Sequence, residues 1–378
     1  MDFNYTEQQS AVRDLAGQVF KDRVTDDFLK GWAKSGEPYD KALWQTLAET
    51  GLLGTAIPEA HGGMGFGIVE LGLILEEQGK ALAPVPLAAT LAMGALPIAE
   101  FGSKEQQQAW LPKVAKGQTI LTAGFTEAYS RDPTQPGMTA RLDGNVWRLD
   151  GEKICVPYGR QAERILVTAK TGAGSIGVFL LDPTAAGVTT EAQATTAGEP
   201  QAIVSAGGAK VLPSDVLGDP DKGVAVLAWT WQRAATCLAG CQVGVGGEAL
   251  RRTVEYVTNR VQFGRPIGSF QAVQHRAADG FVDLEAMRAT YQKAAWRLAQ
   301  NLPSAAEVAA AQWWACIGGQ RIVHTTQHLH GGMGADIDYP IHRFFLWARQ
   351  IEAALGGAAF NLAKIGAELA AGTPDPLT

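Results

Sequence analysis

The sequence predicts a protein of three domains, in which a helical domain, a domain of antiparallel strands and a four-helix domain follow one another. Hydrophobic residues repeat with the period of a helix from Thr6 to about Lys116. From Thr119 the pattern changes to short β-type runs separated by turn signals. Four long helical stretches then begin at Gly223, and their lengths suit an antiparallel bundle. We therefore place the domains at residues 1–118, 119–218 and 219–378.

The N-terminal domain is predicted to begin with a helix capped at Thr6, because Gln9 lies three residues further on and completes a capping box. Ser103 is a good cap for the last helix of the domain. The other helices are expected at residues 40–50, 69–82, 87–101 and 104–115. Between them, Gly51–Gly65 holds so many glycines that its backbone must form a loop with positive φ angles. Such a loop either only connects two helices or brings backbone close to a ligand, and the residues leave both open.

The middle domain contains the short β-type runs expected of a small antiparallel barrel or sandwich. Strands are expected at residues 120–125, 147–150, 163–169, 176–181 and 209–211. Residues 185–207 are rich in Ala, Thr and Gly, and their pattern assigns no element. The last domain is expected to hold helices at residues 223–260, 270–300, 304–330 and 340–371.

Composition narrows the class of protein. The net charge of −6 argues against nucleic acid as a bulk partner. The four cysteines are scattered and form no Cys-x-x-Cys pair, so a reducing, cytoplasmic location without disulfides is expected. The N-terminus lacks the features of a signal peptide, and no apolar run is long enough to cross a bilayer, so no membrane partner is expected.

The most informative stretch runs from Arg260 to His275. It places Arg260, then Phe263, then a tight Gly-Arg-Pro turn after a long helical pattern, and Gln271 stands at the head of the next helix. A guanidinium pairs with a diphosphate through two hydrogen bonds, an aromatic ring stacks on a base, and an amide reads a base edge. Such a stretch can hold a nucleotide cofactor. It can also be an ordinary corner between two helices that is closed by an arginine. The residue types alone do not distinguish between these two alternatives.

This stretch resembles the Arg-x-x-Phe-Gly-x-Pro-x-x-x-x-Gln block of the acyl-CoA dehydrogenase family. Gly51–Gly65 resembles that family's Gly-Leu-x-Gly…Pro-Glu…Gly-Gly-x-Gly loop, and the order of the three domains matches over nearly the whole chain. The resemblance implies an acyl-CoA dehydrogenase-like fold, a tetramer and FAD as cofactor. It further implies that Arg260, Phe263 and Gln271 hold the ADP half of an FAD bound mainly by a neighbouring subunit.

Two further stretches carry expectations for the same cofactor. Phe125–Asp132 resembles the family's Thr-Glu-Pro-x-Ala-Gly-Ser-Asp, which implies flavin contacts at Phe125 and Thr126 and a hydroxyl contact from Ser130. Tyr129 and Arg131 depart from that pattern, and the stretch is one residue shorter. An ordinary strand end, turned by Asp132-Pro133, is the alternative.

The second stretch follows the third helix of the last domain. His328, Gly331 and Gly332 align with the family's Gln-x-x-Gly-Gly-x-Gly, which implies that they lie on the adenine side of the FAD. A Gly-rich turn beside a helix end exposes N–H groups suited to phosphate. His324, His328 and His330 also invite a metal interpretation, but the stretch lacks the Glu of a zinc hydrolase and no further ligand is near. No metal is expected.

The sequence also lacks groups that the family uses. Where the family usually has a Trp and, two residues on, a Thr that donates to flavin N5, this chain has Cys155 and Pro157. Proline offers neither an N–H nor a hydroxyl, so a flavin at this site would be less well shielded and tuned. Some branches of the family share such a Val-Pro.

The catalytic base is the larger gap. Desaturation of an acyl-CoA needs a carboxylate of raised pKa in a dry site to remove the α-proton. The family keeps this base at one of two places. Aligned on Tyr339-Pro340, Leu355 occupies the first. At the second, the pair most similar to the family's Glu-Arg is Gln232-Arg233, and Ala234 is the strict match when the residues are counted back from Gly244. Asp338 is a weak candidate, because Asp338-Tyr339-Pro340 also fits the start of a helix. The remaining candidates fit exposed or paired positions better: Glu255, Glu285 and Glu352.

These observations predict a subunit of an FAD-dependent acyl-CoA dehydrogenase. The resemblance to the α2β2 steroid-degrading members of the family favours a base-lacking partner in a heterotetramer, acting on a steroid-derived or other unusual acyl-CoA. It implies an electron-transfer flavoprotein or similar acceptor. A self-sufficient homotetramer with a relocated base and a cofactor-free structural partner are the alternatives. A different reaction on the same fold, such as acyl-CoA oxidation by O₂ or nitroalkane oxidation, is a weaker one.

Overall fold

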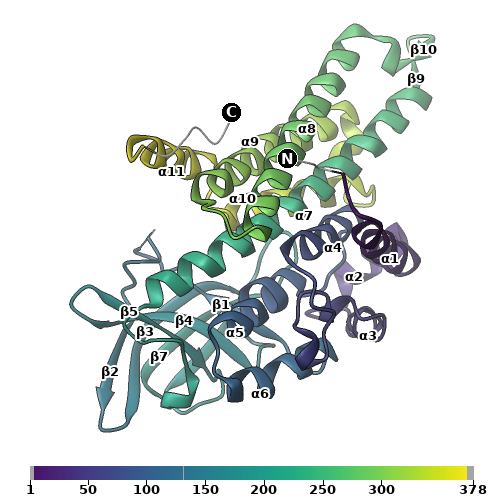
Figure 1. The fold of residues 1–378 in the computed structure, drawn as a ribbon. Coiled ribbons are helices and arrows are strands. Elements are labelled where there is room, and N and C mark those ends of the chain that lie inside the picture. Colours follow the sequence, from purple (N-terminus) through teal and green to yellow (C-terminus); the bar gives the residue numbers. More distant parts are fainter. Residues whose placement is uncertain (1–3, 131, 373–378) are drawn as a thin grey trace. The chain divides into compact units, whose positions relative to one another are not determined.

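The computed structural model describes residues 4–130 and 132–372, which fold into two compact units (Figure 1). The first, called here the helical unit, comprises the described residues of Met1–Gly36, Ile68–Ala83 and Ala235–Thr378. The second, called the sheet unit, comprises Glu37–Gly67 and Pro84–Ala234. Helix α7 (Gly223–Asn259) begins in the sheet unit and continues into the helical unit. Arg131, one of the departures from the family pattern, lies outside the described residues.

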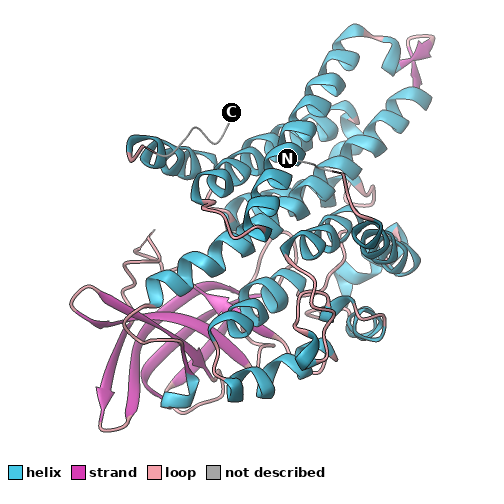
Figure 2. Ribbon diagram, in the orientation of Figure 1, coloured by secondary structure: helices cyan, strands magenta, loops and turns pink. Residues whose placement is uncertain are grey.

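Helices make up the helical unit except for one short pair of strands (Figure 2). The capping box expected at the start of α1 is confirmed, because the Thr6 hydroxyl accepts from the Gln9 N–H at 3.2 Å and the Gln9 side chain accepts from the Thr6 N–H at 3.0 Å. The elements after α1 (Glu7–Arg23) are α2 (Asp26–Ser35), α4 (Ile68–Ala81), the last 25 residues of α7, β9 (Val261–Gln262), β10 (Arg265–Pro266), α8 (Gln271–Ala299), α9 (Ala305–Leu329), α10 (Ile341–Ala354) and α11 (Ala358–Ala370).

Two features of this unit differ from the expectation. The single helix expected at residues 340–371 is two helices, because the chain turns at Gly356 and Gly357, whose φ angles of 85° and 80° no helix contains. Helix α2 was not expected. It begins after Thr25, whose hydroxyl accepts from the Phe28 N–H at 3.1 Å. Its ten residues bury only Leu29, so the helix is too short to stand out in the longer windows in which helical periodicity is read.

The strands of the sheet unit form one sheet in the order β6-β7-β3-β2-β4-β5-β8, with β1 beside β4. Most pairs are antiparallel, as expected, while β1 and the first residue of β2 pair with β4 in parallel. Apolar side chains on one face of these strands make the core of the unit. The strands are β1 (Leu121–Gly124), β2 (Thr139–Asp143), β3 (Val146–Pro157), β4 (Arg164–Gly172), β5 (Ser175–Leu181), β6 (Val188–Gln193), β7 (Gln201–Val211) and β8 (Val216–Leu217).

The region left without assignment, residues 185–207, forms β6 and most of β7. Along the first six residues of β7 every second side chain is buried, and the buried ones are Ala202, Val204 and Ala206. Small side chains at the buried positions hid the alternation that marks a strand. Strand β2 was also missed, since a single residue, Ala140, is buried in it.

Helices α3 (Lys41–Glu49), α5 (Leu96–Phe101) and α6 (Lys104–Ala115), with a π-helical segment at Ala88–Ala95, complete the sheet unit. Ser103 caps α6 as expected, in a capping box with Gln106. The loop Gly51–Gly65 uses its glycines for its own packing: a Cβ at Gly63 would lie 2.0 Å from the carbonyl oxygen of Ile57. This close approach explains a glycine there without a ligand.

Candidate functional site

Arg260 follows the last residue of α7 and is held by its backbone. Its N–H donates to the Tyr256 carbonyl at 2.8 Å, and its carbonyl accepts from the Ile267 N–H at 2.8 Å, which closes the corner before α8. Its side chain is exposed, and its guanidinium makes no hydrogen bond or ion pair with the described residues. Among these residues the corner therefore does not use the Arg260 guanidinium to close itself.

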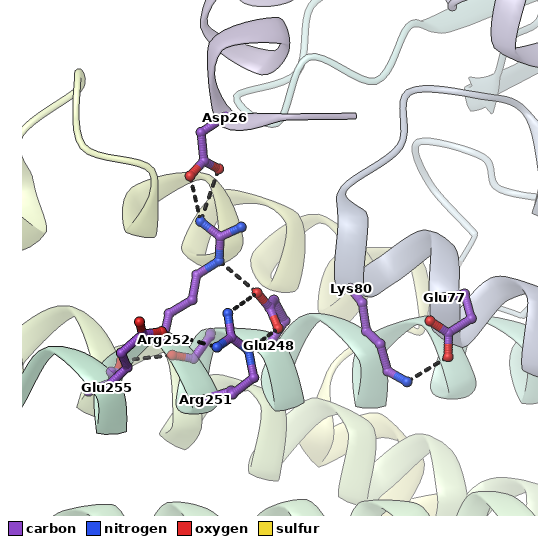
Figure 3. A network of polar contacts seen from close by, with 9 residues as sticks. Asp26, Glu77, Lys80, Glu248, Arg251, Arg252 and Glu255 are labelled. Carbon is purple, nitrogen blue, oxygen red and sulfur yellow. Dashed lines mark hydrogen bonds and ion pairs between the residues drawn. The ribbon is translucent and has the colours of Figure 1, made fainter. Parts of the chain in front are cut away.

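The neighbouring arginines of α7 behave differently (Figure 3). Arg251 pairs with Glu248 at 2.7 Å and with Glu255 at 3.1 Å. Arg252 pairs with Glu248 at 2.8 Å and with Asp26 of α2 at 2.8 Å through one guanidinium nitrogen that contacts both carboxylate oxygens. Both guanidinium groups are thus neutralised by carboxylates.

These arginines and Arg260 line a cavity of about 720 Å³ in the helical unit. Of the three, Arg260 alone has no carboxylate partner in the described part of the chain, so its charge is free to meet an anion. The cavity is lined by Asp26, Arg251, Arg252, Glu255, Tyr256, Asn259, Arg260, His330, Tyr339, Pro340 and Ile341.

The turn between β9 and β10 carries Phe263 at its tip. Phe263 and Gly264 have φ angles of 55° and 78°, the left-handed pair typical of a two-residue type I′ hairpin. This conformation is unfavourable for phenylalanine. The Phe263 ring is 90% exposed and lies edge-on to the Phe270 ring, at 6.1 Å between centroids. An exposed aromatic side chain on a strained turn is open to a ligand or a partner.

Two other expected site residues lie at helix ends that adjoin each other. Gln271 is the exposed first residue of α8, and His328 lies in the last turn of α9. Arg276, in the second turn of α8, contacts His328 Nδ1 through Nη1 at 2.7 Å. The beginning of α8 and the end of α9 therefore lie side by side.

The glycine turn after α9 is open on one side. A Cβ built at Gly331 or Gly332 would meet no atom within 4 Å, whereas one at Gly334 would lie 2.2 Å from the Gln327 carbonyl oxygen. The turn itself needs glycine at 334 for space and at 331 for its φ of 60°. Nothing in the described chain requires glycine at 332, which leaves room for a ligand or partner to approach the backbone.

The three histidines of this region do not converge. His328 contacts Arg276, and the His324 ring packs edge-on against Phe345 at 4.9 Å. His330 is buried, with its ring stacked on Tyr256 at 4.4 Å and its Nδ1 2.8 Å from the Thr326 carbonyl oxygen. Burial lowers the pKa of His330. No group of three or more His, Cys, Asp or Glu side chains in the described residues is placed to hold a metal ion.

The expected flavin contacts of the sheet unit follow β1. Phe125 is half-buried and Thr126 is exposed, with the Thr126 carbonyl accepting from the Ile154 N–H at 2.9 Å. The Ser130 hydroxyl lies 3.0 Å from the carbonyl oxygens of Asp132 and Gln135 and closes the loop. Within the described residues the Thr126 hydroxyl makes no hydrogen bond and is open to a ligand, while Ser130 uses its own hydroxyl within the loop.

A buried ion pair ties this loop to the sheet. Lys153 of β3 is fully buried, and its Nζ contacts Glu127 Oε1 at 2.6 Å and the Thr168 hydroxyl at 3.2 Å. Glu127 also accepts from the N–H groups of Gly137 and Met138. Burial raises the pKa of Glu127, but the Lys153 ammonium and the two N–H groups outweigh it and lower the pKa overall. Burial lowers the pKa of Lys153, and Glu127 opposes that shift.

The strand β3 is irregular where the family places its Trp and Thr. Cys155 has a φ of 54°, and its N–H donates to Gln193 Oε1 of β6 at 2.7 Å. The register against β7 shifts between Lys153 and Val156, as in a β-bulge. Pro157 offers its carbonyl to the Thr122 hydroxyl at 2.7 Å and has no N–H to donate.

The two positions expected for the family's base are apolar and closed. The side chains of Leu355 and Ala234 are fully buried. Asn361 holds the turn that contains Leu355, because its Nδ2 donates to the carbonyls of Leu355 and Gly357, each at 2.9 Å. This turn offers no carboxylate and little freedom to present another side chain.

The other carboxylates considered as bases are paired. Asp338 is not the helix cap that its sequence suggested: the cap of α10 is Pro340, and Asp338 contacts Lys30 at 2.7 Å on the surface. The Lys30 ammonium lowers the pKa of Asp338, the opposite of what a base for an α-proton needs. The pairs of the other candidates are Glu255 with Arg251, Glu285 with Arg288 and Glu352 with Arg349. Burial raises the pKa of Glu352.

Sequence reasoning missed two groups that the structure ties to the expected site. Lys153 was detectable, because it falls on the face of β3 that also buries Leu149, and a buried lysine needs a carboxylate. Arg276 was not detectable from the sequence, because its contact with His328 joins residues 52 positions apart and depends on how α8 packs on α9.

The family model described as acyl-CoA dehydrogenase, N-terminal domain, matches residues 6–118, and the one described as acyl-CoA dehydrogenase, C-terminal domain, matches residues 221–370. Acyl-CoA dehydrogenase FadE27 of Mycobacterium tuberculosis is 39% identical over 98% of this chain and 99% of its own length. The chain belongs to the acyl-CoA dehydrogenase family. Members are flavoprotein oxidoreductases that act on the CH–CH group of acyl-CoA thioesters.

Two solved structures are similar to this member of the family over almost their full length. The Tcur3481-Tcur3483 steroid ACAD shares 43% identity with a TM-score of 0.90, covering 97% of this chain and 98% of that one. The ChsE4-ChsE5 complex from Mycobacterium tuberculosis shares 38% identity with a TM-score of 0.93, covering 98% and 99%. Both establish the acyl-CoA dehydrogenase fold expected from the sequence. In the described chain, no helix combines the length and the apolar character that a membrane crossing requires.

Proposed function

We propose that this chain is an FAD-binding subunit of a heterotetrameric acyl-CoA dehydrogenase, and that its partner subunit supplies the catalytic base. One observation carries the proposal: both positions where the family keeps its base hold fully buried apolar side chains, Leu355 and Ala234. The similarity to a steroid ACAD named for two proteins, and to a complex of two proteins, supports a mixed assembly and a steroid-derived acyl-CoA as substrate.

The residues of the helical unit fit the ADP half of FAD. Arg260 provides for the diphosphate a guanidinium that pairs with no carboxylate of residues 4–130 and 132–372, and Phe263 provides an exposed ring for stacking. Gln271 and His328 provide exposed polar groups at helix ends that lie side by side, and Gly331 and Gly332 leave backbone open beside them. Each of these groups is free to face a partner subunit.

The sheet unit fits the flavin less fully. Phe125 and Thr126 follow β1, and the Glu127–Lys153 pair fixes the loop that carries them, with Ser130 closing it. Pro157 cannot donate to the flavin, so this chain is not expected to tune a flavin of its own through that position.

In the reaction, bound FAD supplies an acceptor for the hydride from the β-carbon of the acyl group. This chain would hold the ADP end through Arg260 and position the cofactor, while a carboxylate of the partner removes the α-proton. The complex would pass the electrons on to an electron-transfer flavoprotein or a similar acceptor.

Co-expression with the homologous subunit tests this proposal. We expect the chain purified alone to be colourless and the mixed complex to be yellow, because each FAD needs groups from both subunit types. The measurement is flavin released per protomer after gel filtration. A chain that retains one flavin per protomer without a partner would contradict the shared site, and a colourless complex would favour a cofactor-free structural role.

A further inference from the structure

The end of α9 carries a contact that the proposed function does not use. Arg276 Nη1 lies 2.7 Å from His328 Nδ1, and both side chains are exposed. The two residues come from different helices, α8 and α9. Arginine and protonated histidine repel each other, so a close contact between them requires the histidine to be in its neutral form.

The chemistry of the two groups fixes the proton on the imidazole. A guanidinium has donors only and keeps its charge, so Nδ1 of His328 must accept the hydrogen bond. A neutral imidazole carries one proton, which then resides on Nε2. A doubly protonated ring would offer no acceptor and would place two positive charges side by side. Arg276 therefore selects the neutral tautomer of His328 with a donor at Nε2.

That donor has no use inside the described chain. No described residue accepts a hydrogen bond from His328 Nε2, and the ring is exposed beside the open turn at Gly331 and Gly332. The family's glutamine at this place carries a donor and an acceptor whatever its surroundings. A histidine presents a defined donor there only if something fixes its tautomer.

We propose that Arg276 is a positioning residue, which holds His328 in the tautomer whose Nε2–H donates to a ring nitrogen or another acceptor at the adenine end of the FAD. This inference rests on the proposed function for the identity of the ligand. The fixed tautomer itself rests on the Arg276–His328 contact alone.

A double-mutant cycle in the co-expressed complex tests the inference, with FAD dissociation as the readout. Arg276→Met removes the donor to Nδ1, and we expect FAD to be held about five- to tenfold less tightly, the effect of one weakened hydrogen bond. In a His328→Gln background the same substitution should change FAD binding less than about twofold, because an amide needs no tautomer selection. Arg141→Met, an exposed arginine of β2, serves as the control for loss of one positive charge.

If Arg276→Met weakens FAD binding equally in the wild-type and His328→Gln backgrounds, the inference is overturned, because Arg276 then acts on the ligand or the fold directly. If Arg276→Met weakens FAD binding in neither background, the inference is overturned as well. Nitrogen NMR of the complex labelled at histidine gives a readout without the cofactor. We expect an unprotonated Nδ1 for His328, assigned by its absence in His328→Gln, and a mixture of tautomers in Arg276→Met. The two ideas can fail separately. If Arg260→Ala leaves FAD binding unchanged, the proposed function is contradicted. If His328 still shows a single tautomer that is lost in Arg276→Met, the selection of the tautomer by Arg276 nevertheless holds.

Discussion

An Arg260→Ala variant of the co-expressed complex is expected to lose FAD during gel filtration, with binding weakened by about 2–4 kcal/mol or roughly 30- to 1000-fold. The guanidinium of Arg260 has no carboxylate partner among the described residues, so no ion pair with them has to be broken before it binds a diphosphate. Equilibrium titration of the apoprotein complex with FAD, followed by flavin fluorescence, measures the change.

Two variants sharpen this test. Arg260→Lys keeps the charge but loses the planar pair of donors, so its affinity for FAD should lie between wild type and Arg260→Ala. Arg251→Ala removes a guanidinium from the same helix and cavity that Glu248 and Glu255 already neutralise, and its affinity should stay within about threefold of wild type. Equal losses from Arg251→Ala and Arg260→Ala would mean that the general charge of the cavity binds the cofactor, and not Arg260.

A Lys153→Met variant is expected to lose about 3–5 kcal/mol of the free energy of unfolding. The substitution leaves the Glu127 carboxylate, 10% exposed, without its cation in the interior of the sheet unit. Urea denaturation followed by circular dichroism, with and without the partner subunit, measures the loss. Because Glu127 directly follows Thr126, flavin binding should weaken as well.

The matched control removes both charges. Lys153→Met with Glu127→Gln keeps an acceptor for the Gly137 N–H and leaves no buried charge, so it should recover at least about half of the lost stability.

The pH dependence of the stability has a defined sign. The pKa of Glu127 in the folded wild type lies below the ordinary 4.5, so its contribution is present above that pH and is lost as the pH falls through the folded pKa. The difference in the free energy of unfolding between wild type and Lys153→Met should therefore become smaller at acid pH. A difference that becomes larger at acid pH would contradict the ion-pair explanation.

Much of the fold was predictable from the sequence, because the last domain consists of long helices separated by short turns. The helices that became α7, α8 and α9 were predicted close to their observed bounds, and the caps at Thr6 and Ser103 lie where the side-chain chemistry put them. The failures have separate physical causes. Strand β6 buries no side chain and β7 buries small ones, so the alternation that marks a strand is faint in both. The break between α10 and α11 depends on two adjacent glycines rather than on a change of hydrophobic pattern.

The candidate site was predictable as a set of residues and not as a set of contacts. Motif spacing indicated Arg260, Phe263, Gln271 and His328, but whether the Arg260 guanidinium was free or paired depended on where Glu248 and Asp26 lay. Those carboxylates are distant from one another in sequence, so only folding reveals that they neutralise Arg252. The same holds for Asp338, which looked like a helix cap and proved to contact Lys30.

The central claim is that this chain contributes groups that hold FAD without carrying the base, and anaerobic titration of the co-expressed complex with an acyl-CoA thioester tests it most directly. The flavin absorbance is followed in the unaltered complex and in complexes whose copy of this chain carries Glu352→Gln or Asp338→Asn. The account predicts that the flavin is bleached at the same rate in all three complexes. Loss of bleaching in either variant would place a working base among the residues of this chain and contradict the account.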